Sequence, residues 1–398
     1  MGPARSGTLD AELAVMSNNM KAPLGIAAAF LFIAGCGSRS AGSAPLLGPP
    51  GSLMSSVSIP APSGAAAWKV RYVSTGLDGK RIEVSGVVIA PNSVGKNRPI
   101  IAYAHGTTGI AEACAPSKRD PMFKLMTGLH DMIARGFVVA ATDYPGLGTS
   151  GTHGYLVGIS EGRAVLDSAR SARHIAATAA SARFIPWGYS QGGHAALFAG
   201  QLAATYAPEL RMVGVAAGAP PTDLHDIFKF HIEQNRNRVL AAYILSSWSS
   251  IYNLPLQQVL DARSILALRL AARTCLGTTL DAAVAVLHNF NLGKNFLNDR
   301  LHQNAAWNQR FKENAPRIVS GAPYFVVQGM TDTIVPPKDT TAYVKRICTN
   351  GNAVAYSRIA GMGHIAADKE AATSAVAWIA SRFKGVRARS DCTSGDWQ

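Results

Sequence analysis

Gly188-Tyr189-Ser190-Gln191-Gly192 is the stretch that decides the fold of this 398-residue chain. A short apolar run, residues 184–187, precedes it, and an alanine-rich segment with helical character, residues 193–204, follows it. The pattern Gly-x-Ser-x-Gly between a strand and a helix is typical of a sharp turn that exposes a serine hydroxyl. Glycine is needed on both sides because a side chain there would collide with the neighbouring strand or helix. The sequence therefore predicts that Ser190 is a nucleophile at a helix N-terminus, where backbone N–H groups stabilise a reacting oxygen.

A serine nucleophile needs a base that takes its proton and an acid that holds the base in one tautomer. In the fold that carries this turn, the chain order is Ser, then Asp or Glu, then His. Asp332 follows a buried apolar run at residues 324–329. His364 follows a second strand-like run at residues 353–359, on a glycine-rich loop, with room for one helix between the two runs. The sequence predicts the triad Ser190, Asp332 and His364.

Other acids and histidines compete for these roles. Asp143 also follows a strand-like run but precedes the serine, and Asp332 has an alternative interpretation as a turn former. His105 also precedes the nucleophile, and His194 follows Ser190 by only four residues on the same predicted helix. Four further candidates for the base fall in a predicted helical region: His225, His231, His288 and His302. Chain order favours Asp332 and His364.

Ester hydrolysis also needs an oxyanion hole. One donor is expected to be the backbone N–H of Gln191, the residue after the nucleophile, and the other comes from the loop after an early strand. Residues 99–104 form such a strand, and the loop His105-Gly106-Thr107-Thr108-Gly109 follows it. We place the second donor at Thr107, with its neighbours in the loop as alternatives.

Five segments read together resemble the secretory lipase family of α/β-hydrolases, which includes the fungal lipase A type and related bacterial lipases and esterases. These segments are residues 105–109, 143–148, 155–163, 188–193 and 361–364. Residues 155–163 are the most family-specific of them, and packing is the favoured role for most of this segment. The resemblance implies an α/β-hydrolase fold, with a mostly parallel central sheet, helices on both faces and an inserted helical cap.

The domain organisation follows from this fold. The hydrolase core is expected at residues 65–220 and 317–398, and the cap at residues 221–316. Within the cap, apolar residues recur with helical periodicity, and no run is a convincing strand. The core is expected to open with an antiparallel hairpin formed by residues 70–73 and 81–89. In the family that the chain resembles, such a cap covers an acyl pocket.

The N-terminus is expected to contain an extension ahead of the natural start. Residues 1–19 include Asp10 and Glu12, which do not suit the beginning of a targeting signal. The sequence predicts that residues 1–19 are a non-native start extension and that the true start is Met20 or Met16.

Residues 20–35 are predicted to be a lipoprotein-type signal peptide. Their apolar run, residues 24–34, suits a signal peptide core and is too short to span a bilayer. Cys36 follows and is the expected lipidation site; the alternative is a plain secreted protein with an incidental cysteine. Residues 36–64 are rich in Gly, Ser, Pro and Ala, which predicts a flexible tether.

Four further cysteines predict two disulfides in an exported chain. Four cysteines allow three pairings. The resemblance implies a Cys114–Cys275 bond between the oxyanion loop and the cap. Position favours a Cys348–Cys392 bond that fastens the C-terminal tail.

Composition limits the partners. The formal net charge is +14, but the charge is spread along the chain without the interleaved aromatic residues of a nucleic-acid platform. No metal-ligand cluster or phosphate-binding loop is evident, so neither a metal nor a cofactor is expected.

The sequence predicts an exported serine carboxylesterase or lipase that acts on small-molecule or lipid esters. It is expected to be anchored by lipid to the bacterial envelope, at the outer membrane or the periplasmic face. The alternatives are a serine peptidase or acyltransferase of the same fold and a non-catalytic envelope lipoprotein.

Overall fold

A computed structural model of the protein describes residues 48–234, 237–277, 279–293, 296 and 300–393. Its strands are β1 (Leu53–Ile59), β2 (Ala65–Thr75), β3 (Arg81–Pro91), β4 (Arg98–Ala104), β5 (Val138–Thr142), β6 (Ala180–Tyr189), β7 (Arg211–Met212), β8 (Val215–Gly218), β9 (Tyr324–Gly329) and β10 (Val354–Ile359). They form one sheet in the order β1-β2-β3-β5-β4-β6-β8-β9-β10, with β7 beside β6. Strands β1, β2, β3 and β5 pair antiparallel, and all other neighbours are parallel. The expected mostly parallel sheet is confirmed.

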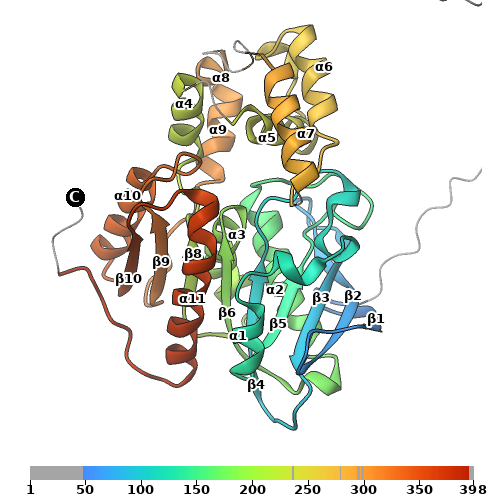
Figure 1. Cartoon of the computed structure of the whole chain (residues 1–398), viewed down its shortest axis with the longest axis vertical. Helices are drawn as coiled ribbons and strands as arrows, with labels where there is room; N and C mark the ends of the chain where they lie inside the picture. The colour runs from blue at the N-terminus through green and yellow to red at the C-terminus, as the bar shows by residue number, and fades with distance from the viewer. Residues whose placement is uncertain (1–47, 235–236, 278, 294–295, 297–299, 394–398) are drawn as a thin grey trace, which may run out of the picture. The chain divides into compact units, whose positions relative to one another are not determined.

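Helices cover both faces of this sheet (Figure 1). Helices α2 (Gly158–Ala172) and α3 (Gln191–Tyr206) pack on one face, and α1 (Leu129–Ala134) and α11 (His364–Phe383) pack on the other. Strand β5 shows why both faces need cover. Val138 and Ala140 point into the core under α2 and α3, whereas Val139 and Ala141 point into the core under α1 and α11. A strand buried on both faces has no polar side, and this explains its continuous apolar sequence.

The segment between β8 and β9 contains the cap. Its helices are α4 (Leu224–Gln234), α5 (Arg238–Ile251), α6 (Ala262–Ala271), α7 (Thr279–Asn291), α8 (Arg300–Gln303) and α9 (Ala305–Glu313). They gather at the end of the sheet where the parallel strands finish (Figure 1). The cap has a core of its own, in which Trp248 stacks on Trp307 at 6.4 Å between ring centroids and Phe311 packs beside Trp248. The residues described in this segment include no strand, as the sequence predicts.

The predicted tether is wrong for part of its length. Residues 53–59 form β1, which pairs antiparallel with β2 and extends the sheet N-terminal to the expected core boundary at residue 65. Its sequence, Leu-Met-Ser-Ser-Val-Ser-Ile, is serine-rich and mostly exposed, so its composition resembles that of a linker. Strand β2 provides the backbone partner that fixes this segment. The leading hairpin is confirmed as β2 and β3, which join with Thr75 opposite Arg81.

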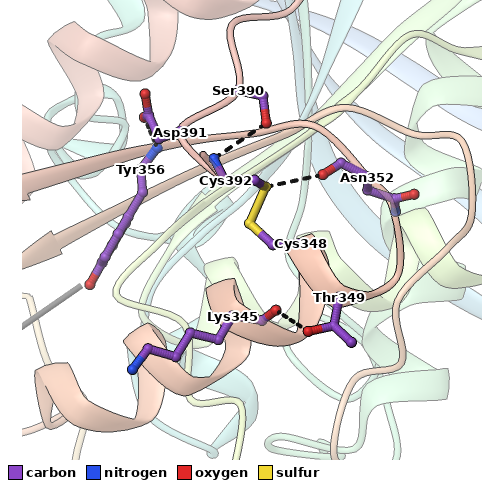
Figure 2. The surroundings of a disulfide bond; sticks show 8 residues. All are labelled: Lys345, Cys348, Thr349, Asn352, Tyr356, Ser390, Asp391 and Cys392. Atoms are coloured by element: carbon purple, nitrogen blue, oxygen red, sulfur yellow. Dashed lines mark hydrogen bonds between the residues drawn. A yellow bond between two sulfur atoms is a disulfide. The ribbon is translucent and has the colours of Figure 1, made fainter. Parts of the chain in front are cut away.

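Both expected disulfides are present, as Cys114–Cys275 and Cys348–Cys392. The second fastens the C-terminal tail to α10 (Pro337–Thr349), as Figure 2 shows. In the same tail, the Asp391 N–H donates to the Val354 carbonyl at 2.8 Å. The Asp391 carboxylate accepts from the Tyr356 N–H at 2.9 Å. The tail thereby covers the free edge of β10, which would otherwise present unpaired backbone groups.

The remaining N-terminal predictions fall on residues that the structure does not describe. These are the start extension (1–19), the signal peptide (20–35), the lipidation site Cys36 and the first part of the tether. Among the helices of the described residues, none has the length and apolar character needed to cross a membrane.

Candidate active site

Ser190 stands at the junction of β6 and α3 in a backbone conformation that few side chains adopt. Its φ is 58° and its ψ is −123°. A Cβ atom on Gly188 would lie 2.4 Å from the Ala104 carbonyl oxygen, and a Cβ on Gly192 would lie 2.0 Å from the same oxygen. Only glycine fits such an approach. The end of β4 and the start of α3 therefore meet without a side chain between them, and the turn projects Ser190.

His364 links Ser190 to Asp332. The His364 Nε2 atom lies 2.8 Å from Ser190 Oγ, and its Nδ1 lies 2.6 Å from Asp332 Oδ2. These contacts assign the tautomer: Nδ1–H donates to the carboxylate, and Nε2 accepts the serine hydroxyl proton. Asp332 follows β9, and His364 is the first residue of α11, so adjacent parallel strands bring the two together. This is the geometry of a serine activated by an oriented base.

The Asp332 carboxylate is buried and fully oriented. Its Oδ1 accepts the N–H groups of Ile334 and Val335 at 2.8 and 2.9 Å. Its Oδ2 also accepts from Gln328 Nε2 at 3.0 Å. The competing acid, Asp143, is buried elsewhere and accepts from Ser85 Oγ and from the Ser117 N–H. These contacts fasten the short helical turn at Pro116–Lys118 to Ser85 of β3, whereas His364 pairs with Asp332.

The competing histidines have other partners. The His105 ring contacts the carbonyls of Gly106 and Asp143. His194 contacts Glu161 Oε2 and the Asn314 carbonyl. These contacts hold both rings away from the base position. His231, in the cap helix α4, lies 2.9 Å through its Nε2 from the Ile334 carbonyl and thus joins the cap to the loop that carries Asp332. Burial lowers the pKa of His231 to about 4.

The loop at residues 105–109 lies against the turn at residues 188–192, which we call the elbow. A Cβ on Gly106 would lie 3.4 Å from the Tyr189 carbonyl, and a Cβ on Gly192 would lie 2.9 Å from the His105 carbonyl. Thr107 Oγ1 is 2.8 Å from the Tyr155 hydroxyl. The Thr108 carbonyl accepts the Leu276 N–H of the cap at 2.8 Å, next to the Cys114–Cys275 disulfide. The loop is therefore held between the elbow and the cap.

A narrow apolar pocket of about 40 Å³ lies beside Ser190 and is partly open to solvent. Its walls come from both the core and the cap. Residues that line it include Tyr155, Leu156, Pro221, Leu224, Ile227, Phe228, Leu240, Ala241, Ile244 and Val335. An apolar channel with one polar end suits a ligand with a hydrocarbon chain and one reactive group. The described residues contain no cluster of three His, Cys, Asp or Glu side chains that could hold a metal ion.

The sequence did not reveal three polar residues at this site. Glu161 and His153 both contact the Gln191 side chain, and His231 joins the cap to the acid loop. Glu161 could have been found from its position among small residues in the segment 155–163, which suggests that the helix is tightly packed there. A buried carboxylate must find partners, so a charged residue in a helix packed on both sides indicates more than packing. No pattern marks His153 or His231, because their partners are distant in sequence.

The fold and the site define an α/β-hydrolase with a serine-centred site. The model of the family described as "Secretory lipase" matches residues 124–391. Lipase A of Moesziomyces aphidis is 23% identical over 83% of this chain and 75% of its own length, and a secreted triacylglycerol lipase of Malassezia globosa is 26% identical over 83% and 73%. The crystal structure of Candida antarctica lipase A in its closed state superposes with a TM-score of 0.71 at 23% identity, over 86% of this chain and 84% of that one. The chain belongs to the secretory lipase family, and it is a serine ester hydrolase.

We predict that Gly192→Ala destabilises the protein by about 3 kcal/mol or more, because the new Cβ would overlap a backbone carbonyl that cannot move away. Gly106→Ala is the matched control in the adjacent loop, where the new Cβ meets only an ordinary contact at 3.4 Å. Denaturant unfolding of both variants measures the difference. Equal stability of the two variants would contradict the close approach of β4 and α3.

We also predict that His153 makes stability fall as the pH is lowered from about 6.5 to 4. Its Nδ1–H donates to the Pro145 carbonyl and its Nε2 accepts from Gln191, and burial lowers its pKa to about 4. The unfolded chain binds a proton below pH about 6.5 whereas the folded chain does not, so the free energy of unfolding decreases across this window by about 3 kcal/mol.

The measurement is the free energy of unfolding against pH for the wild type, His153→Gln and, as control, the exposed His130→Gln. The decline should be shallower in His153→Gln and unchanged in the control. Comparing variants cancels the opposite contribution of Asp167 and Asp339, whose pKa values burial raises to about 6. A His153→Gln curve parallel to that of the wild type would refute the assignment.

Proposed function

We propose that the protein hydrolyses lipid-type acyl esters with Ser190 as nucleophile, His364 as general base and acid, and Asp332 as the group that orients His364. The observation that carries the proposal is the continuous hydrogen-bonded chain from Ser190 Oγ through His364 to Asp332, at 2.8 and 2.6 Å. Distances of this kind allow proton transfer without prior rearrangement.

The reaction proceeds in two halves. Ser190 Oγ bonds to the ester carbonyl carbon while its proton passes to His364 Nε2. The resulting tetrahedral intermediate collapses, the bond between the carbonyl carbon and the alcohol oxygen breaks, and His364 returns the proton to the departing alcohol. Water then repeats the sequence on the acyl-enzyme and releases the carboxylic acid.

The oxyanion is held by backbone N–H groups at the start of α3 and in the loop at residues 105–109. Gln191 is the first residue of α3, where the N–H groups have no partner within the helix and the helix dipole is positive. The second donor is Thr107, whose side-chain bond to Tyr155 holds this part of the loop beside the pocket. Each such donor contributes on the order of 3 kcal/mol to transition-state stabilisation.

The apolar pocket is the proposed acyl site. Most of its cap wall is apolar, with residues such as Leu224, Ile227 and Ile244. The polar cap residue in this wall, His231, already has hydrogen-bond partners at both ring nitrogens and offers none to a peptide backbone. This favours an acyl chain over a peptide, because a peptide would leave buried amide groups unpaired. The proposed substrates are therefore esters of fatty acids, in keeping with the lipases among the relatives of this chain.

Membership of the secretory lipase family and the two disulfides support export of the protein. We propose that residues 20–35 direct that export and that Cys36 receives the lipid anchor. The apolar run at residues 24–34, which ends in Ile33-Ala34 and is followed by Gly35-Cys36, supports this assignment. Labelling cells that express the full chain with a palmitate analogue tests it, since Cys36→Ser should remove the label.

We predict that Ser190→Ala lowers kcat on p-nitrophenyl esters by about 10⁴-fold or more, because the acyl-enzyme can no longer form. The assay uses the full chain. A fluorophosphonate probe should label the wild type and not the variant. Unchanged turnover in Ser190→Ala would refute the proposed mechanism.

We further predict that Ala241→Leu shortens the preferred acyl chain. Ala241 is buried in the pocket wall on α5, so a larger side chain occupies space that a long acyl chain would need. The ratio of kcat/KM for p-nitrophenyl laurate to that for the acetate should fall by about 10-fold. Ser250→Leu adds the same side chain to the exposed side of α5 and should leave the ratio unchanged. An equal loss on both esters would place the acyl chain elsewhere.

A further inference from the structure

Glu161 is a buried carboxylate next to the nucleophile elbow that the proposed mechanism does not use. It lies in the first turn of α2, and its side chain has no exposed surface. Burying an ionised carboxylate costs several kcal/mol unless hydrogen bonds and an opposite charge compensate it. The hydrogen bonds of the Glu161 carboxylate therefore indicate which parts of the site it holds in place.

Two of these contacts reach residues that line the pocket together with Ser190. Glu161 Oε1 accepts from Gln191 Nε2 at 2.7 Å and from the Leu156 N–H at 2.9 Å. Gln191 follows the nucleophile directly, and Leu156 lines the pocket with Ser190. Leu156 has a φ of 55°, in the left-handed region that few non-glycine residues occupy. Its bond to Glu161 holds this segment in its unfavourable conformation.

The Gln191 side chain is held at two points. Its Nε2 also donates to His153 Nε2 at 3.1 Å, so both amide hydrogens have acceptors. Its Oε1 is buried and, among the described residues, has no hydrogen-bond partner. The Gln191 side chain is therefore held by the two hydrogen bonds of its amide nitrogen, although its amide oxygen has no partner among the described residues. Such a fixed side chain also fixes the first turn of α3, where the proposed oxyanion donor is the backbone N–H of the same residue.

His194 contacts the other oxygen of the Glu161 carboxylate. Its Nδ1 lies 3.4 Å from Glu161 Oε2, and its Nε2 lies 2.8 Å from the Asn314 carbonyl. The ring is thus held between α2 and the Asn314 backbone, and it helps to fix the Glu161 side chain in place.

We propose that Glu161 is a positioning residue of this site, which aligns the oxyanion donor through Gln191 and the pocket wall through Leu156, while His194 contacts its second oxygen. The inference rests on the proposed function. Glu161 does not touch the substrate. It lowers the reaction barrier by fixing a donor before the negative charge develops, an effect that appears in kcat and not in KM.

Asp167 provides a matched control on the same helix. Its carboxylate is also fully buried and accepts from Ser74 Oγ at 2.7 Å, Tyr206 Oη at 2.7 Å and Arg170 Nη1 at 2.8 Å. These contacts join α2 to β2 and to the far end of α3. Asp167→Asn therefore removes a buried charge from α2 without touching the elbow, and it reports what a purely structural loss does to kcat.

The experiment measures kcat, KM and thermal midpoint on p-nitrophenyl butyrate for the wild type, Ser190→Ala, Glu161→Gln and Asp167→Asn. We expect kcat of Glu161→Gln to fall roughly 10- to 100-fold with KM nearly unchanged, because a donor displaced by a fraction of an ångström loses most of its effect. Asp167→Asn should retain kcat within about threefold, whatever its thermal midpoint. Equal kcat values for the two variants would overturn the inference.

The experiment also covers a variant that does not fold and a wild type without activity. If Glu161→Gln does not fold, Gln191→Ala replaces it: this variant keeps the backbone N–H but removes the link to Glu161, so the same fall in kcat is expected. Wild-type kcat in Gln191→Ala would then overturn the inference. A wild type without Ser190-dependent turnover refutes the proposed function and the inference with it. Ser190-dependent turnover with an unaffected Glu161→Gln refutes the positioning role alone.

Discussion

The approach of Gly188 and Gly192 to the Ala104 carbonyl is the constraint on which the rest of the site depends. Because no side chain separates β4 from α3, the chain turns within one residue and leaves Ser190 at a φ of 58°. The same approach brings the loop after β4 against the elbow. These close contacts with one backbone carbonyl thus set the direction of the Ser190 side chain and the position of the loop at residues 105–109, before any polar side chain takes part.

The loop after β9 couples the acid of the site to the cap. Ile334 donates its N–H to Asp332 and accepts a hydrogen bond at its carbonyl from His231 of α4. Asn237, just before α5, also donates to the Thr333 carbonyl at 3.3 Å. Any displacement of α4 from the core must break or stretch these bonds and therefore bears on the loop that orients Asp332. The position of the cap and the orientation of the Asp332 carboxylate are therefore coupled through this loop.

The sequence predicted what local patterns encode, and it failed where distant contacts decide. The turn around Ser190 and the places of Asp332 and His364 after two strands follow from residue types and spacing, and the family resemblance implied the helical cap. Strand β1 did not, because its serine-rich sequence resembles a linker and only pairing with β2 makes it a strand. The contacts of Glu161 were not predicted either, since its partner Gln191 lies 30 residues away. Helical periodicity indicates that a residue is buried but not which residue it contacts.

Two buried carboxylates near Ser190 each contact a histidine, but the third partner differs. Asp332 contacts His364 at 2.6 Å, and Glu161 contacts His194 at 3.4 Å. The first histidine presents its other nitrogen to the Ser190 hydroxyl, a group that can donate a proton. The second presents its other nitrogen to the Asn314 carbonyl, which only accepts hydrogen bonds. A hydroxyl can therefore give its proton to the histidine, as the proposed mechanism requires, whereas a carbonyl can only hold the ring in place.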